Sequence, residues 1–430
     1  MRIIDAAQYG DIRELTRRPV AKDLTLAATV SAIIDRVKSE GDQAVLEYAQ
    51  RFDGCAPAHL SVSELERDAR AACAPEALHQ ALSQAIASLT KFHRAQCAPE
   101  QSVETVPGVV CSRRSVAIER VGIYIPNGLA PLFSTLFMLA VPARVAGCKE
   151  IALATPGGKE GVLNPAIALC ARLLGISEIY LMGGAQAIAA LACGTESIKP
   201  VSKVCGPGNR YVTEAKLQLA AKGVAIDMPA GPSEVLIVAD EAADPRYIAA
   251  DLLAQAEHGP DSQVVLVACD RSIVERTLAE VDRQCAQLPR KGTAVAALTQ
   301  SFALLVNSLD DALAFSNLYA PEHLILSVKD PQPLAAQVVN AGSVFLGYWA
   351  AEALGDYSSG TNHVLPTNGA AVAYSGVSVD TFVKKITFQS VSRAGLEALA
   401  ETVTTMARAE GLEAHAQAIV VRQGADYVVR

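Results

Sequence analysis

The stretch VGIYIPNGLAPLFSTLFMLAVPARVAGCKEIALAT, residues 121–155, decides the fold class because it contains one complete strand, turn, helix and strand. Residues 121–125 are a short apolar run, PNG at 126–128 is a turn, residues 134–146 have a helical pattern, and 150–155 are a second apolar run. Short apolar strands that alternate with helices predict a parallel sheet with both faces covered.

The alternation of strands and helices continues through most of the chain. Further apolar runs lie at 178–182, 203–205 and 225–228 in a first series, and at 235–239, 263–268, 303–307, 323–328 and 343–346 in a second. We therefore predict an α/β fold of two Rossmann-like, doubly wound parallel-sheet units. The expected parts are an N-terminal arm at 1–20, one α/β domain formed by 21–120 with 230–377, another at 121–229, and a helical C-terminal appendage at 378–430.

The bulk composition restricts the classes of function. The 430 residues are 51% hydrophobic and carry a net charge of −8, with a sequence pI of about 5.5 and no run of Lys and Arg. This composition argues against binding to nucleic acid or to an anionic membrane. No apolar run reaches the roughly 18–20 residues of a membrane-spanning helix, and the N-terminus has no secretory signal, so we expect a cytoplasmic protein.

The ten cysteines form no Cys-x-x-Cys pair. In a cytoplasmic protein we interpret them as small buried hydrophobic residues, and not as disulfides or zinc thiolates. Cys148 and Cys205, near predicted strand ends, are the two candidates for a catalytic cysteine.

Four of the seven histidines lie beside acids or amides, in short polar islands of an otherwise apolar C-terminal half. The islands are Gln255 with Glu257 and His258, Glu322 with His323, Asp356 with Asn362 and His363, and Glu410 with Glu413 and His415. A divalent cation and a proton relay both need such side chains. We expect folding to bring the islands into one site. The remaining histidines, interpreted as surface or packing residues, are His59, His79 and His93.

Two of the islands have a simpler interpretation beside the chemical one. Gln255 and His258 are three residues apart at the end of a predicted helix and so share a face. They either bind one cation, together with Asp356 and another histidine, or are solvated. Glu322 and His323 provide either two bases of different pKa or an ion pair at a strand end.

The other polar residues are ambiguous by themselves. The polar loop 358–363 is either a binding loop or a solvated turn. Glu410 and His415 are five residues apart and, taken alone, indicate a solvated helix face. Ser233 is either a turn residue or a substrate contact.

Three glycine turns follow strands and precede helices: PNG at 126–128, GGAQ at 183–186 and GPGN at 206–209. Glycine lets a ligand approach the backbone, and a helix N-terminus favours phosphate. The turns therefore form either a nucleotide crevice or tight connections without a ligand. The dinucleotide fingerprint Gly-x-Gly-x-x-Gly is absent, because Tyr211 stands where the third glycine belongs.

Several separated motifs, taken together, resemble the histidinol dehydrogenase family. They run in order from about residue 121 to 415 and include VGIYIPNGLAPLFST, GGAQAIAALA, GPGNRYVTEAK, DMPAGPSE, QAEHGPDSQ, PEHL, AGSVFLG, GDYSSGTNHVLPT and AEGLEAH. One small departure is Asn127, where the family often has glycine. Asparagine tolerates positive φ, so the departure weakens the resemblance little.

The resemblance implies oxidation of L-histidinol to L-histidine through L-histidinal, with two molecules of NAD used in succession. It also implies one zinc ion per chain, and a homodimer in which the tail 378–430 reaches the partner's site. Residues 121–229 would then be the NAD side, and 21–120 with 230–377 the catalytic domain.

The resemblance also implies roles for single residues. The zinc ligands would be Gln255, His258, Asp356 and His415. The catalytic pair would be His323, which takes the hydroxyl proton, and Glu322, which activates water to hydrate the aldehyde. The substrate contacts would be Ser233, His363 and Glu410, together with His323 and the zinc ligands. The cofactor contacts would be Tyr124, Gln186 and Asn209.

Two other functions fit parts of the pattern. A paralogue of the same fold would oxidise another small alcohol, such as a sulfonated diol, and would need Glu322 and His323 but not the imidazole-binding residues. A zinc hydrolase would use Glu322 as the base for metal-bound water, but it leaves the glycine turns unexplained. The polar residues His363, Glu410 and His415 favour histidinol.

Overall fold

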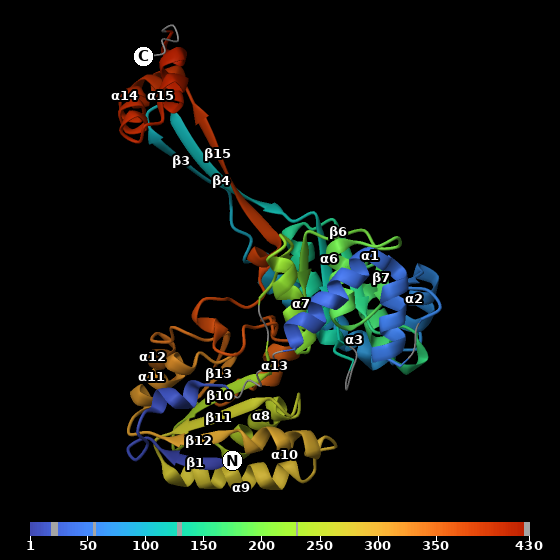
Figure 1. The fold of residues 1–430 in the computed structure, drawn as a ribbon. Coiled ribbons are helices and arrows are strands. Elements are labelled where there is room, and N and C mark those ends of the chain that lie inside the picture. Colours follow the sequence, from blue (N-terminus) through green and yellow to red (C-terminus); the bar gives the residue numbers. More distant parts are fainter. Residues whose placement is uncertain (19–24, 55–56, 127–130, 229–230, 425–430) are drawn as a thin grey trace. The chain divides into compact units, whose positions relative to one another are not determined.

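The computed structural model describes residues 1–18, 25–54, 57–126, 131–228 and 231–424 (Figure 1). It has two compact units, Met1–Gln96 with Ile118–Phe382 and Cys97–Ala117 with Val383–Arg430. The first unit contains two six-stranded sheets, and the second contains a three-stranded sheet. Among the described residues, no helix is both long enough and apolar enough to cross a membrane.

The first sheet has the strand order of a doubly wound nucleotide-binding fold. Its neighbouring strands are, in order, β2 (Ser61–Val62), β7 (Glu178–Leu181), β6 (Glu150–Thr155), β5 (Arg120–Tyr124), β8 (Lys203–Cys205) and β9 (Ala225–Ile226). The strands β5 to β9 pair in parallel, and β2 pairs with β7 in the antiparallel direction. Numbered along the chain, the parallel strands follow the order 3-2-1-4-5, which confirms the Rossmann-like prediction for this part.

Helices bury both faces of the first sheet. The helices are α4 (Phe133–Ala146), α5 (Pro165–Leu173), α6 (Gly184–Cys193) and α7 (Arg210–Ala220). Val121 and Ile123 of β5 belong to the core that contains α4 and α5, whereas Tyr124 belongs to the core that contains α6 and α7. Burial on both faces explains why β5 is an apolar run without polar alternation.

The second sheet repeats the same order with every strand parallel. Its neighbouring strands are, in order, β1 (Arg2–Asp5), β12 (Phe302–Leu305), β11 (Gln263–Ala268), β10 (Glu234–Ala239), β13 (His323–Ser327) and β14 (Ser343–Leu346). The helices α8 (Pro245–Ala256), α9 (Arg271–Cys285) and α10 (Lys291–Thr299) cover one face, and α11 (Leu309–Tyr319) and α12 (Gln332–Ala335) cover the other (Figure 1). The second predicted α/β unit is therefore confirmed.

The N-terminal segments do not lie where we expected them. The predicted arm 1–20 begins with β1, which pairs with β12, and continues into the short helix η1 (Ile12–Thr16), where Leu15 joins the core of the second sheet. An edge strand with one buried apolar side chain, Ile4, gives only a weak apolar pattern.

The helices of 21–120 pack on the first sheet, not with 230–377. They are α1 (Leu26–Phe52), α2 (Glu64–Ala71) and α3 (Glu76–Arg94). The buried stripe Val30, Ile33, Ile34 and Val37 of α1 lies in the core that also contains α6 and α7, and β2 joins the first sheet through β7. An apolar stripe determines which face of a helix is buried, but it does not choose between two apolar sheets.

The second unit corrects the expected helical tail 378–430. Its sheet consists of β15 (Val383–Val391), β4 (Val109–Ala117) and β3 (Gln101–Val106), all antiparallel, and its helices are α14 (Arg393–Ala409) and α15 (Glu413–Val420). The nine residues of β15 pair with β4 over their full length. This register depends on a segment more than 260 residues earlier, which no local helical or strand pattern reveals.

The remaining elements are α13 (Glu352–Tyr357), η2 (Gly158–Glu160), η3 (Ala370–Val372), η4 (Val379–Phe382) and η5 (Val421–Gln423).

Candidate active site

The polar islands of the first unit gather at the amino ends of the strands in the second sheet. His323 is the first residue of β13, and it lies in register with Val235 of β10 and Ser343 of β14. Helix α8 follows β10 and runs back across the sheet, so its C-terminal end carries Gln255 to the same edge. Ligands of open α/β sheets generally bind at the carboxyl ends of the strands, so a candidate site at the amino ends departs from that rule.

Glu322 and His323 are buried and are fixed by the backbone of β10. The backbone N–H of Glu234 donates to Glu322 Oε2 at 2.8 Å, and His323 Nδ1 lies 3.1 Å from the Glu234 carbonyl oxygen. A carbonyl oxygen only accepts hydrogen bonds, so this contact favours the tautomer with the proton on Nδ1 and the basic nitrogen at Nε2. His323 Nδ1 also lies 3.6 Å from Glu322 Oε2, and Nε2 lies 3.5 Å from Asp356 Oδ1.

The electrostatics of this pair follow from burial and from crowded carboxylates. Burial by itself would lower the pKa of His323, but Glu352, Glu322 and Asp356 outweigh it and hold that pKa well above its usual value. Burial raises the pKa of Glu322, while His323 and the Glu234 amide oppose the rise. The pair therefore combines a strongly basic ring with a carboxylate of increased basicity.

Glu352 is a further buried acid at this site, and we did not predict it. Its side chain is fully buried at the start of α13 and accepts a hydrogen bond from Gln255 Nε2. Burial raises its pKa well above the usual value. Glu352 lies one helical turn before Asp356, so the two carboxylates share a face of α13. The available signal was an acid four residues before Asp356, a spacing that places the two on one face only because 352–357 is a helix.

The donor atoms at this edge suit a cation. Ligand atoms of His323, Glu352 and Asp356 lie within 4.8 Å of one another. Three buried atoms have no hydrogen-bond partner among the described residues: Gln255 Oε1, His323 Nε2 and Glu352 Oε2. Unsatisfied buried polar atoms are rare, and nitrogen with carboxylate oxygen is a common ligand set for zinc. These residues therefore fit the predicted metal.

His258 also belongs to this electrostatic group. His258 is exposed on one side, but burial of the rest of the side chain lowers its pKa. The negative charge of Asp356 partly opposes this effect. A neutral ring is the form that binds metals. Of the predicted zinc ligands, Gln255 and Asp356 both lie beside His323, and His258 is near enough to Asp356 for the charge of Asp356 to affect its pKa.

The polar loop 358–363 connects this edge to α4. His363 Nδ1 donates to the Asp356 carbonyl oxygen at 2.8 Å, and its Nε2 lies 3.3 Å from Thr135 Oγ1. Burial lowers the pKa of His363. Asn362 donates to the Met138 carbonyl oxygen at 2.6 Å and lies 3.5 Å from the fully buried His93, which is a packing residue.

Two residues predicted for the site, Glu410 and His415, lie in the second unit, and a third, Ser233, lies at the amino edge of the second sheet. Glu410 is the residue after α14, and His415 is in α15. Their part in the site stays a prediction. Ser233 directly precedes β10, where its carbonyl oxygen accepts from the Gln263 backbone N–H at 3.1 Å. This places Ser233 beside Glu234 at the amino edge.

The predicted cofactor residues lie at the carboxyl edge of the first sheet. The Tyr124 hydroxyl oxygen accepts from the Gly184 backbone N–H at 3.1 Å, and burial raises the pKa of Tyr124 to about 12. Gln186 is buried in the first turn of α6, and its Nε2 has no hydrogen-bond partner among the described residues. Asn209 caps α7 by accepting from two backbone N–H groups. An unsatisfied amide beside a helix N-terminus fits a nucleotide ligand.

The turns at this edge are packed so tightly that two of them require glycine. A Cβ at Gly183 would lie 2.6 Å from Pro156 Cγ, and one at Gly206 would overlap the Tyr124 carbonyl oxygen. Gly206 also has a φ of +133°, which other residues rarely adopt. The turn predicted at 126–128, including the departure at Asn127, lies mostly outside the described residues.

The two candidate cysteines are unsuitable as nucleophiles. Cys148 and Cys205 are buried free thiols. Burial raises the pKa of Cys148 to about 11 and raises that of Cys205 further. Because the thiolate is the nucleophile, neither residue is reactive at neutral pH.

Comparison with known proteins decides the family. The family described as histidinol dehydrogenase matches residues 16–423. The chain belongs to the histidinol dehydrogenase family. A histidinol dehydrogenase from Bacteroides fragilis is 49% identical over 422 residues, which cover 98% of this chain and 99% of the relative. Another, from Xanthomonas axonopodis pv. citri, is 50% identical over 431 aligned positions, which cover 99% of each chain.

A solved structure of the same family has the same fold. The crystal structure of histidinol dehydrogenase from Elizabethkingia anophelis matches with a TM-score of 0.96 and 47% identity, and the match covers 99% of this chain and 98% of the other. The resemblance read from the separated motifs is thereby confirmed.

Proposed function

We propose that the protein oxidises L-histidinol to L-histidine through L-histidinal, the last steps of histidine biosynthesis, with NAD as the oxidant in both steps and one zinc ion per chain. The observation that carries the proposal is the buried pair Glu322 and His323, with Glu352 and Asp356 near enough to His323 to share a cation, in a chain of this family. The full-length identity to relatives named histidinol dehydrogenase supports the substrate.

His323 would act on the hydroxyl proton of the substrate. Its Nδ1 is held by the Glu234 carbonyl oxygen, so Nε2 is the atom that accepts the proton as hydride leaves the carbon. The surrounding carboxylates raise the pKa of His323, and a bound divalent cation would offset their charge and return that pKa toward the range of a general base.

Glu322 would act in the second oxidation. The aldehyde must gain water before a second hydride can leave, and a carboxylate is a suitable base for that water. The Glu234 N–H fixes one oxygen of Glu322, and burial keeps the group more basic than in water. Because Glu322 and His323 share an anchor on Glu234, their relative positions are set before substrate binds.

The zinc ion would be held by Gln255, His258 and Asp356, with His415 as the fourth expected ligand. When bound, it would supply the positive charge that holds the substrate's imidazole and amine. NAD would lie along Tyr124, Gln186 and Asn209 and would accept hydride. Ser233, His363 and Glu410 would provide the other substrate contacts.

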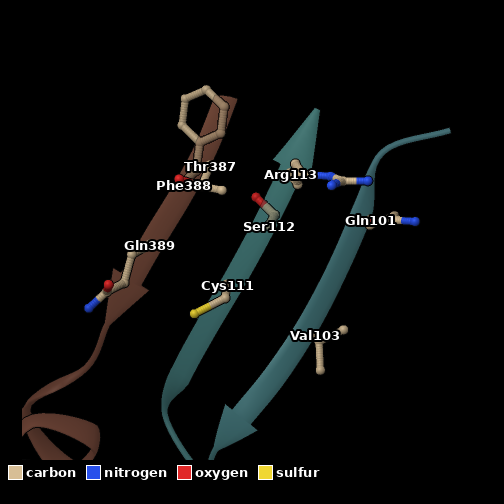
Figure 2. A pocket seen from close by; sticks show the side chains of 8 residues that line it. All are labelled: Gln101, Val103, Cys111, Ser112, Arg113, Thr387, Phe388 and Gln389. Carbon is tan, nitrogen blue, oxygen red and sulfur yellow. The ribbon is translucent and has the colours of Figure 1, made fainter. Parts of the chain in front are cut away.

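A homodimer with shared sites is part of the proposal. Glu410 and His415 belong to the second unit, and the sheet of that unit presents apolar side chains to solvent. Figure 2 shows a shallow hollow on this sheet, with Val103 and Cys111 among the residues that line it. Val103 is 60% exposed and Phe388 is 39% exposed. Exposed apolar residues gathered on one sheet support contact with another chain.

A cytoplasmic location is also part of the proposal, in keeping with the biosynthetic relatives.

One assay tests the proposed function. Purified protein should form NADH from NAD and L-histidinol, and His323→Ala should slow the reaction by about 10²–10⁴-fold. A metal chelator should remove activity, and added zinc should restore it. Full activity in a metal-free preparation contradicts the zinc assignment. Oxidation of another alcohol, such as a sulfonated diol, in preference to histidinol would favour the paralogue, and hydrolysis without NAD would favour the zinc hydrolase.

A further inference from the structure

Asp53 lies at the carboxyl edge of the first sheet, although it comes from a helix that precedes the sheet. It is the residue after α1. An added Cβ at Gly183 would lie 3.3 Å from Asp53 Oδ2 and 2.6 Å from Pro156 Cγ. Pro156 follows β6, and Gly183 stands between β7 and α6. The carboxylate is also close enough to Tyr124, at the end of β5, to influence the hydroxyl. Asp53 is therefore placed where three neighbouring strands end.

The carboxylate of Asp53 has no protein partner among the described residues. The side chain is half-buried, and the pKa of Asp53 is raised by burial, with no cation or hydrogen-bond donor opposing the rise. Two acids beside the same sheet, Glu178 and Asp227, are by contrast paired with Arg120 and Lys216. A desolvated carboxylate without a partner lowers stability, which suggests that it serves a ligand.

A second unsatisfied group lies at the same turn. Gln186 is 1% exposed, and its Nε2 lacks a hydrogen-bond partner among the described side chains and backbone. A Cβ at Gly184 would lie 2.7 Å from Gln186 Oε1, so the absence of a side chain at 184 makes room for this amide. The turn thus offers one acceptor, Asp53, and one donor, Gln186, on either side of two glycines.

This pair matches what a dinucleotide needs at the edge of a Rossmann-like sheet. In such domains an acid about 20 residues after the first glycine turn accepts hydrogen bonds from the ribose hydroxyls of NAD, and its charge disfavours the 2′-phosphate of NADP. Here β6 ends in Thr155 and Pro156 and supplies no acid. Asp53 brings a carboxylate to the end of β6 from α1 instead.

We propose that Asp53 accepts hydrogen bonds from the hydroxyls of the adenine ribose of NAD and sets the preference for NAD over NADP. The inference rests on the proposed function, because it requires NAD to bind at this edge. It assigns to helix α1 a direct part in cofactor recognition, in a chain that lacks the usual glycine fingerprint.

Equilibrium binding tests the inference without any turnover. Isothermal titration calorimetry would measure the dissociation constants of NAD and NADP for the wild-type protein, Asp53→Asn and Asp53→Glu. The matched control is Asp35→Asn, which removes the same charge from an exposed position of the same helix. Loss of hydrogen bonds to a charged acceptor should weaken NAD by about 10- to 100-fold in Asp53→Asn. NADP should weaken far less or improve, so the preference between the two cofactors should collapse.

The outcomes separate this inference from the proposed function. If the wild-type protein binds NAD and Asp53→Asn keeps both affinities, the role of Asp53 is wrong while the use of NAD stands. If the wild-type protein binds neither cofactor, the NAD assignment fails, and the role of Asp53 fails with it. If Asp53→Asn does not fold, as judged by circular dichroism, Asp53→Glu decides: it keeps the charge and should retain the preference against NADP.

Discussion

Arg18 and Glu234 form a buried ion pair with two parallel hydrogen bonds, each 2.9 Å long. The guanidinium of Arg18 also lies 3.6 Å from the centre of the Tyr319 ring. The backbone of Glu234 holds both members of the proposed catalytic pair, Glu322 through its N–H and His323 through its carbonyl oxygen. The N-terminal segment is therefore connected to the catalytic edge through a single residue of β10.

We expect Arg18→Met to lower the free energy of unfolding by about 3–5 kcal/mol, because it leaves the carboxylate of Glu234 buried without its cation. Arg18→Lys should cost less, since it keeps the charge but loses the two-pronged geometry and the ring contact. Urea unfolding would measure both. The double variant Arg18→Met with Glu234→Gln should recover part of the loss, because no unpaired charge remains. A double variant as unstable as the single one would argue against this account.

The two members of the catalytic pair should differ in their effects on the two oxidations. His323→Ala should slow both steps by about 10²–10⁴-fold, because each step transfers a hydroxyl proton. Glu322→Gln should slow the oxidation of histidinal more than that of histidinol, because only the aldehyde needs added water. Single-turnover measurements that start from each substrate would separate the steps. Equal slowing of both steps by Glu322→Gln would contradict the role in water activation.

Asp251 should make stability depend on pH. It lies on α8, where burial raises its pKa to about 6, while a hydrogen bond from the Glu352 backbone N–H opposes the rise. Because its pKa is higher in the folded protein than in the unfolded chain, ionisation of Asp251 destabilises the folded state. This destabilisation is absent below the unfolded pKa near 4, and it is complete once the pH has risen above about 6. Asp251→Asn should therefore stabilise the protein by about 2 kcal/mol at pH 8 and hardly at all at pH 4.

Urea unfolding at several pH values would measure this effect of Asp251. The control is the exposed residue Asp35, since Asp35→Asn should change stability equally little at every pH. If Asp251→Asn lowered stability at pH 8, the hydrogen bond to Glu352 would outweigh the burial of the charge.

The shared site can be tested by mixing two inactive variants. His258→Asn removes an expected ligand of the first unit, and His415→Asn removes one of the second. If His415 serves the partner chain, a mixed dimer has one site with both lesions and one with neither. A random mixture is about half heterodimer and should regain about a quarter of wild-type sites. Native mass spectrometry would verify the heterodimers, and heterodimers without activity would place all ligands on one chain.

The sequence by itself determined the α/β class and the two repeated sheets, and it singled out the residues that we propose for the chemistry. Apolar runs of strand length followed by helical patterns are local signals, because burial on both faces of a parallel sheet requires unbroken apolar strands. The polar islands around Gln255, Glu322 and Asp356 stood out against that background. The order of the motifs identified the family.

Only the tertiary structure decided which segments meet. An apolar stripe determines which face of α1 is buried but not which of two similar sheets buries it, and Arg18 and Glu234 are paired across more than 200 residues without any local signal. The position of the site at the amino edge depends on the return path of α8, and Glu352 joined the site only because 352–357 is a helix. Such contacts are decided by which long-range packing buries the most apolar surface and satisfies the buried charges, so they cannot be read from a local pattern.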